Sequence, residues 1–266
     1  MKRLMQESQV DFLSCSNSSI KGMDLFNKKT ISSLSNLNNY EFDELRQFLR
    51  LSKNIEKNNN NTGAEKFPGE MLTPKRLFVK LDDDFSKLLV EFYNTAYNQQ
   101  YKFRLPFEFG KEGSIIVRTN ADQFGRIQIG SEIFGSTMSS RHLKSSFILT
   151  NFINLDNTVD KYPGQIQFFI KHIIDLPEGS TAHYLAYVQW YKPAPNNKIR
   201  FHFSINDDKI CNVELWETNF YPTSRDCIIP IQNILCRFVP SFYHVTNKIN
   251  AKKYMAINPI NRHFHL

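Results

Sequence analysis

The sequence lacks long hydrophobic runs and contains few cysteines. No stretch of about 18 uncharged apolar residues occurs, so we expect no membrane-spanning helix. At the N-terminus, Lys2 and Arg3 are followed by polar residues in place of an apolar segment, which argues against a secretory signal. The cysteines show no paired spacing and are Cys15, Cys211, Cys227 and Cys236. This usage favours an intracellular, reducing environment.

Motifs of common enzyme classes are also missing. Residues 110–113 lack the spacing and the Lys-Ser/Thr pair of a phosphate-binding loop, and no Gly-x-Ser-x-Gly element supplies a nucleophile. The seven acidic residues of positions 161–266 lie mostly beside turns, which is unlike a two-metal centre. The residues with zinc-ligand chemistry lack a Cys-x-x-Cys spacing and are Cys211, Cys227, Cys236 and His244.

We therefore expect no catalytic residue, no metal and no cofactor. One alternative stays open, an enzyme with a dispersed active site. It would require His142, His172 or His202 to meet acidic residues in one pocket.

The chain is basic, and its charge is uneven. The formal net charge is +7, and residues 161–266 contribute 12 Lys or Arg against 7 Asp or Glu. A basic surface attracts polyanions in a salt-dependent manner. The candidates for contact with nucleic acid are Lys248, Lys252, Lys253 and Arg262. The same cluster is also typical of a solvated surface that keeps a protein soluble.

Composition divides the chain into three parts. Residues 1–70 are rich in Ser and Asn, which predicts a flexible arm with one short helix at about residues 40–52. Residues 71–124 predict a helix, from an apolar stripe after Asp82, followed by strands that pack on the barrel. The three adjacent aspartates at 82–84 suit a helix N-terminus better than a metal site. Residues 125–266 form the third part, a β domain.

From residue 102 onward, short runs of β-branched and aromatic residues alternate with turn signals. Residues 165–174 and 182–192 are rich in β-branched and aromatic residues on two alternating faces, and residues 199–205 alternate between apolar and polar residues. This spacing favours antiparallel strands over βαβ units. We predict an α+β, mainly β fold: an antiparallel barrel or sandwich preceded by one or two helices and a disordered N-terminal arm.

Aromatic residues stand at two strand ends. Trp190 and Tyr191 end one expected strand, and Trp216 ends another. Rings that meet at a loop can form a cage for a methylated ammonium group by cation–π attraction. The alternative is that the rings simply cover the rim of the barrel.

Four segments occur in a fixed order. Residues 164–166 read Gly-Gln-Ile, residues 186–193 read Ala-Tyr-Val-Gln-Trp-Tyr-Lys-Pro, residues 213–216 read Val-Glu-Leu-Trp, and residues 226–239 follow. The set resembles the bromo-adjacent homology (BAH) domain over about residues 125–260, with Lys192 where Arg is usual. Residues 139–142 read Ser-Ser-Arg-His, residues 162–165 read Tyr-Pro-Gly-Gln, and residues 258–262 read Asn-Pro-Ile-Asn-Arg. With these segments the whole chain also resembles an uncharacterised, expanded fungal family, and similar segments accompany transposase-like proteins of mobile elements.

The BAH resemblance implies a non-catalytic protein-interaction module in the nucleus. The implied partner is a chromatin protein or a histone tail, read by the aromatic candidates, while basic residues contact the DNA backbone. Two alternatives remain: a sequence-tolerant DNA-binding accessory protein derived from a transposable element, and a remnant copy without function.

Overall fold

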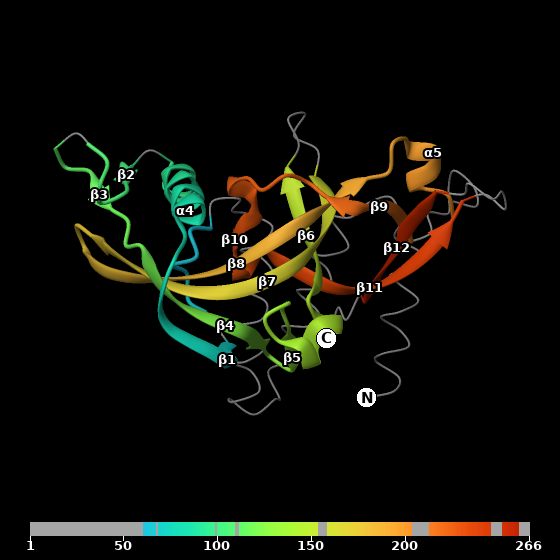
Figure 1. Ribbon diagram of the computed structural model, residues 1–266, viewed down its shortest axis with the longest axis horizontal. Coiled ribbons are helices and arrows are strands. Elements are labelled where there is room, and N and C mark those ends of the chain that lie inside the picture. The colour runs from blue at the N-terminus through green and yellow to red at the C-terminus, as the bar shows by residue number, and fades with distance from the viewer. Residues whose placement is uncertain are drawn as a thin grey trace, which may run out of the picture. The chain divides into compact units, whose positions relative to one another are not determined.

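The computed structural model describes residues 61–67, 69–98, 100–109, 112–153, 159–203, 213–245 and 252–260 (Figure 1). The helix expected at residues 40–52 lies outside the described residues, as do Lys248 and Arg262. Residues 55–261 group into one compact unit. All statements below concern the described residues of this unit.

The first elements are β1 (Gly69–Lys80), α4 (Asp83–Ala96), β2 (Phe103–Arg104), β3 (Ile115–Ile116), β4 (Asn120–Ile129), β5 (Glu132–Phe134), the 3-10 helix η2 (Ser140–Ser145) and β6 (Phe147–Ile153). Next come β7 (Val159–Leu176), β8 (Gly179–Pro193), α5 (Asn197–Arg200) and β9 (Glu214–Phe220). The last are η3 (Arg225–Cys227), β10 (Ile228–Pro230), η4 (Ile231–Asn233), β11 (Ile234–His244) and β12 (Lys253–Ile260). The fold is mainly β with few helices, as predicted.

A long hairpin of β7 and β8 organises the sheet. The two strands pair from Gly164↔Trp190 to Leu176↔Gly179, and burial alternates along much of β8. β8 pairs along one edge of β7. The other edge of β7 pairs with β6 at the beginning of the strand and with β4 toward its end. The hairpin therefore belongs to two parts of the sheet (Figure 1).

Six strands close into a ring in the order β7-β6-β11-β12-β9-β8, and β8 returns to β7. Every pair in this ring is antiparallel, which confirms the expected strand arrangement. Beyond the ring, β4 and β1 extend the sheet from β7, and β10 extends it from β8. β2 and β3 form a separate two-stranded parallel pair.

Close packing explains one glycine of the hairpin. A Cβ atom on Gly164 would lie 2.4 Å from Val188 Cγ1 and 2.5 Å from Trp190 Cε3. These distances are shorter than any real carbon contact, so only glycine lets Trp190 cross β7 at this point.

The helix expected after Asp82 is α4, and it packs on the face of the β7–β8 hairpin (Figure 1). Asp82 is its N-cap and accepts a hydrogen bond from the Phe85 backbone N–H at 2.6 Å. Asp84 pairs with Lys87 at 3.2 Å. The capping interpretation of the three aspartates is therefore confirmed. No helix of the described segments combines the length and the apolar composition needed to span a membrane.

Two expectations about local structure are wrong. The arm does not extend to residue 70, because the Tyr184 N–H donates to the Gly63 carbonyl at 2.8 Å and β1 begins at Gly69. Residues 71–80, for which no element was predicted, form most of β1 because β4 pairs with them. The strand expected at 199–205 begins instead with the one-turn helix α5, which Asn196 caps through the Ile199 N–H.

Candidate functional site

The aromatic candidates do not form an open cage. Trp190, Tyr191 and Trp216 have exposed fractions of 5%, 6% and 1%. Trp190 and Tyr191 are neighbours on β8 and point to opposite faces, so they enter different core clusters. The cage hypothesis for these residues is therefore wrong, because the alternation that fits them to a strand also separates and buries them.

The cation at Trp216 comes from the protein itself. The Arg200 guanidinium carbon lies 4.6 Å from the Trp216 ring centroid. Arg200 also pairs with Asp160 at 2.7 Å and with Glu214 at 2.8 Å. Burial alone would raise the pKa of Asp160, but the hydrogen bonds and charge of Arg200 outweigh it and hold the pKa below its usual value. This interaction joins α5, β7 and β9.

The described part of the C-terminal basic cluster is engaged within the chain. The Lys252 ammonium lies 2.6 Å from Glu217 Oε1, and the Lys253 ammonium lies 3.7 Å from the Phe242 ring centroid. Both groups are solvent-exposed residues of the β11–β12 region. They are therefore less available for phosphate than free surface lysines.

Two histidines face each other across the hairpin, where His172 pairs with His183. His172 Nε2 donates to the Arg118 carbonyl at 2.8 Å, and its Nδ1 accepts from the Tyr93 hydroxyl at 2.9 Å. His183 Nε2 lies 2.7 Å from the Tyr97 hydroxyl. Burial lowers the pKa of each histidine to about 4, so both are neutral at pH 7.

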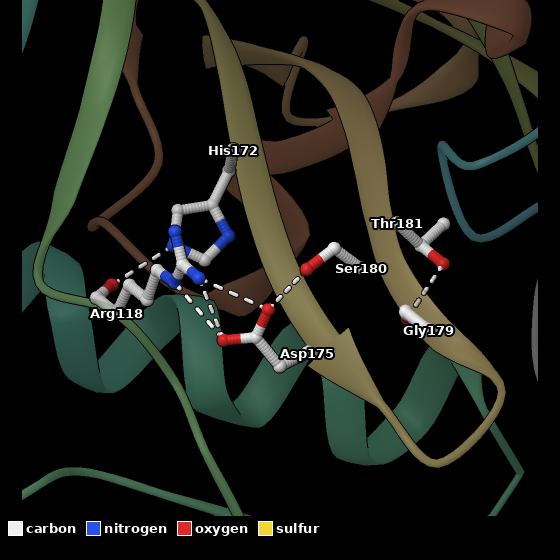
Figure 2. Close-up of polar contacts among 6 residues, drawn as sticks. All are labelled: Arg118, His172, Asp175, Gly179, Ser180 and Thr181. Carbon is white, nitrogen blue, oxygen red and sulfur yellow. Dashed lines mark hydrogen bonds and ion pairs between the residues drawn. The ribbon is translucent and has the colours of Figure 1, made fainter.

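Figure 2 shows the exposed continuation of this network at the end of the hairpin. Arg118 holds Asp175 through both carboxylate oxygens, at 3.0 and 2.7 Å, and the Ser180 hydroxyl donates to the same carboxylate. The Ser180 hydrogen bond, followed by Arg118, lowers the pKa of Asp175. Ser180 therefore donates to a carboxylate that Arg118 also holds and that is a weaker base than usual, and the arrangement joins α4, Arg118 and the hairpin.

The histidines named for a dispersed active site have separate surroundings. His142 Nε2 lies 2.9 Å from Arg126, and His202 Nε2 lies 3.3 Å from the Tyr243 hydroxyl, whereas His172 is buried under α4. Among the described residues no group of three or more His, Cys, Asp or Glu is placed to hold a metal ion. Burial raises the pKa of the Cys227 thiol and raises that of Cys236 to about 11, so neither forms a thiolate readily.

A hollow of about 440 Å³ opens on the sheet face where β1, β4, β7 and β8 lie side by side. We call it the glutamine hollow. Its lining residues are Arg76, Gln123, Thr137, Met138, Gln167, Phe168, Tyr187 and Gln189. The volume is within the usual range for small-molecule sites, and the mixture of amides, one guanidinium and aromatic edges suits polar recognition.

A bulge in β7 shapes the hollow. The β7–β8 register shifts between Ile166 and Phe168, which leaves Gln167 as the extra residue. The loop at Thr137 and Met138 covers this irregularity: the Thr137 N–H donates to the Ile166 carbonyl and the Met138 N–H to the Gln167 carbonyl. Thr137 also donates its hydroxyl to the Gln167 backbone carbonyl at 3.0 Å. One wall of the hollow is therefore held by backbone hydrogen bonds.

The floor is aromatic and closely packed. The ring centroids of Phe168 and Tyr187 are 5.1 Å apart, and Phe85 of α4 meets Tyr187 edge-on at 5.2 Å. Burial raises the pKa of Tyr187. α4 thus holds the rings of Phe168 and Tyr187 in place by packing against them.

Two amides and one cation of the hollow remain open for a ligand. Within the described chain, the side chains of Gln123, Gln189 and Arg76 have no hydrogen-bond or ion-pair partner. By contrast, Gln167 donates to the Gln165 carbonyl. Sequence analysis missed these residues, although Gln167 and Gln189 occupy polar positions of two alternating strands; that pattern was the available signal.

Comparison of the chain with models of protein families, with curated proteins and with solved structures gave no match.

Proposed function

We propose that this chain is a non-catalytic interaction module that binds an extended polypeptide segment in the glutamine hollow. The observation that carries this proposal is a pair of amides, Gln123 and Gln189, that have no partner among the described residues and lie on two strands either side of β7. A primary amide donates and accepts hydrogen bonds, so it matches the alternating N–H and C=O groups of a peptide backbone.

The BAH resemblance supports the same class of function. Its segments lie on β7, on β8, at the start of β9 and from η3 into β11. β7, β8 and β9 are neighbours in the sheet, so the first three segments adjoin in space. A module of this family would act in the nucleus on a chromatin protein or a histone tail.

DNA binding through the C-terminal basic residues is the alternative. The intramolecular partners of Lys252 and Lys253 make it the weaker candidate, because a phosphate would have to replace Glu217 and compete with the Phe242 contact. Steep loss of binding to duplex DNA with rising salt would be its signature.

Selection of random 12-residue peptides displayed on phage against the immobilised full chain tests the proposal. We expect selected peptides to lose about tenfold in affinity when Gln123→Ala and Gln189→Ala are combined, since each lost hydrogen bond weakens binding. Gln128→Ala is the matched control, because Gln128 lies on the same strand as Gln123 but donates to the Gly130 carbonyl outside the hollow. Failure to select any peptide, or equal affinity in all variants, would overturn the proposal.

A further inference from the structure

Arg76 is the one charged side chain among the residues that line the glutamine hollow. The lining segments 75–80, 120–129, 137–145, 165–172 and 184–192 contain eight Lys or Arg residues and one acidic residue, Asp122. Interspersed surface charges of both signs are the norm for a soluble domain. The excess of positive charge in these segments, with Arg76 in the hollow itself, favours a negatively charged partner.

Asp122, the neighbour of the lining residue Gln123, does not form an ion pair with Arg76 among the described residues. Asp122, on β4, accepts a hydrogen bond from the Phe78 backbone N–H at 3.0 Å and lies opposite Lys171 in the β4–β7 register. Arg76 is exposed and forms no ion pair within the described segments. A guanidinium in this position is well suited to a carboxylate, which it binds with two parallel hydrogen bonds.

Next to Arg76, β1 presents two exposed apolar side chains. Leu77 and Phe78 have exposed fractions of 54% and 78%. Phe78 also has a φ of +50°, a conformation that costs a bulky residue free energy. A strained backbone that holds an aromatic ring in solvent is typical of a contact residue, and exposed aromatic and Arg side chains dominate many interfaces.

The shape of β1 indicates how a partner would bind. Pro74 and two register shifts interrupt the strand, so its outer edge is poorly suited to pairing with a further strand. A partner would therefore contact the side chains over the hollow and would not extend the sheet. The floor rings Phe168 and Tyr187 pack on each other and on Phe85, so they are held in the wall of the hollow and do not project from it as stacking platforms for nucleic-acid bases.

We infer that the partner segment is acidic: a carboxylate pairs with Arg76 while a neighbouring apolar side chain packs on Phe78. This inference rests on the proposed function and deepens it. It selects an acidic segment of a partner protein over a basic histone tail and over nucleic acid.

A pooled display library tests the inference with the full chain. The library has three equal parts of random 12-residue peptides with the same four positions fixed. These positions are Glu in the first part, Gln in the second and Lys in the third. We expect the Glu part to be enriched at least tenfold over the Lys part. Arg76→Glu should abolish that preference, because it places a carboxylate where the partner's carboxylate binds. Lys80→Glu, the same charge change on the same strand but outside the hollow lining, should retain most of it.

Phe78→Gly separates binding from folding. Glycine tolerates the positive φ, so we expect an unchanged or higher melting temperature together with about tenfold weaker binding of the enriched peptides. Unaltered binding in this variant would remove Phe78 from the interface.

The outcomes distinguish the inference from the proposed function. If the Gln or Lys part is enriched and its binding depends on Gln123 and Gln189, the hollow binds peptides but the acidic partner is wrong. If no part is enriched, both fail. If no peptide binds but a 20-base-pair DNA duplex does, and Arg76→Glu prevents it, the hollow is a nucleic-acid surface and the inference is overturned.

Discussion

At Trp216 the protein supplies its own cation. The Arg200 guanidinium stacks on the indole and is shared between Asp160 and Glu214. The ring is 1% exposed, so an external ammonium group has no access to it. The same physical attraction that suggested a ligand cage from the sequence acts here to stabilise the fold.

Trp190 should behave as a core residue. We expect Trp190→Ala to lower the free energy of unfolding by about 3–5 kcal/mol, since it empties a large buried volume and removes the Nε1 hydrogen bond to the Asp226 carbonyl at 2.8 Å. Urea denaturation measures this loss. Phe109→Ala is the control, because Phe109 is fully exposed and its removal should change stability by less than about 0.5 kcal/mol.

Arg200 should matter far more than a nearby exposed arginine. Arg200→Gln leaves Asp160 and Glu214 without their shared cation in a half-buried site, so we expect a loss of about 2–3 kcal/mol. Arg225→Gln breaks a surface pair with Asp226 and should cost less than about 0.5 kcal/mol. Equal urea midpoints for the two variants would show that the Arg200 interaction does not stabilise the fold.

At the scale of single elements, the start of α4 is determined by residues that are close together in the sequence. Asp82→Ala removes the acceptor for the Phe85 N–H, and we expect it to cost about 1 kcal/mol. Asp84→Ala removes only an exposed pair with Lys87 and should cost a few tenths of a kcal/mol at most, about the worth of such pairs. Thermal unfolding of both variants separates capping from general negative charge at the helix start.

The strands differ in how much of their structure is local. β7 and β8 were predicted as strands because they are rich in β-branched and aromatic residues and are bounded by turn residues. β1 was not predicted: its side chains are mostly exposed, and its irregular register is set by β4. Residues 199 and 200 alternate with their neighbours, yet the Asn196 cap starts a helix there. The local sequence pattern therefore does not predict the structure where a strand is exposed, as in β1, or where a capping residue starts a helix, as in α5.

Across the whole molecule, the buried histidines couple stability to pH. Both pKa values are lowered to about 4 in the folded chain from the ordinary value of about 6.5, so the unfolded chain binds more protons between these limits. The contribution of the neutral histidines to the free energy of unfolding is fully present above about pH 6.5 and is lost as the pH drops toward 4. Each histidine contributes up to about 1.4 kcal/mol for each unit by which its pKa differs between the folded and unfolded chain.

Urea denaturation from pH 7.5 to pH 4.5 measures this dependence. His183→Gln keeps a hydrogen-bonding group for Tyr97 but removes one titrating site, so the slope of stability against pH should fall by about half. A wild-type stability that stays constant down to pH 4.5 would contradict the prediction.

The sequence by itself determined the mainly β class, the helix after Asp82 and the central hairpin. These features depend on local periodicity, capping groups and turn residues, which are present in short stretches of chain. It also indicated that the chain has a basic surface.

Only the tertiary structure decided where the candidate residues lie. It buried Trp190 and Trp216, paired Lys252 with Glu217, and brought Arg76, Gln123 and Gln189 to one hollow from three strands. Those positions follow from strand pairing between distant segments and from competition for burial. Neither can be predicted from the spacing of neighbouring residues, because the pairing partners of a strand and the face that it buries depend on the whole sheet.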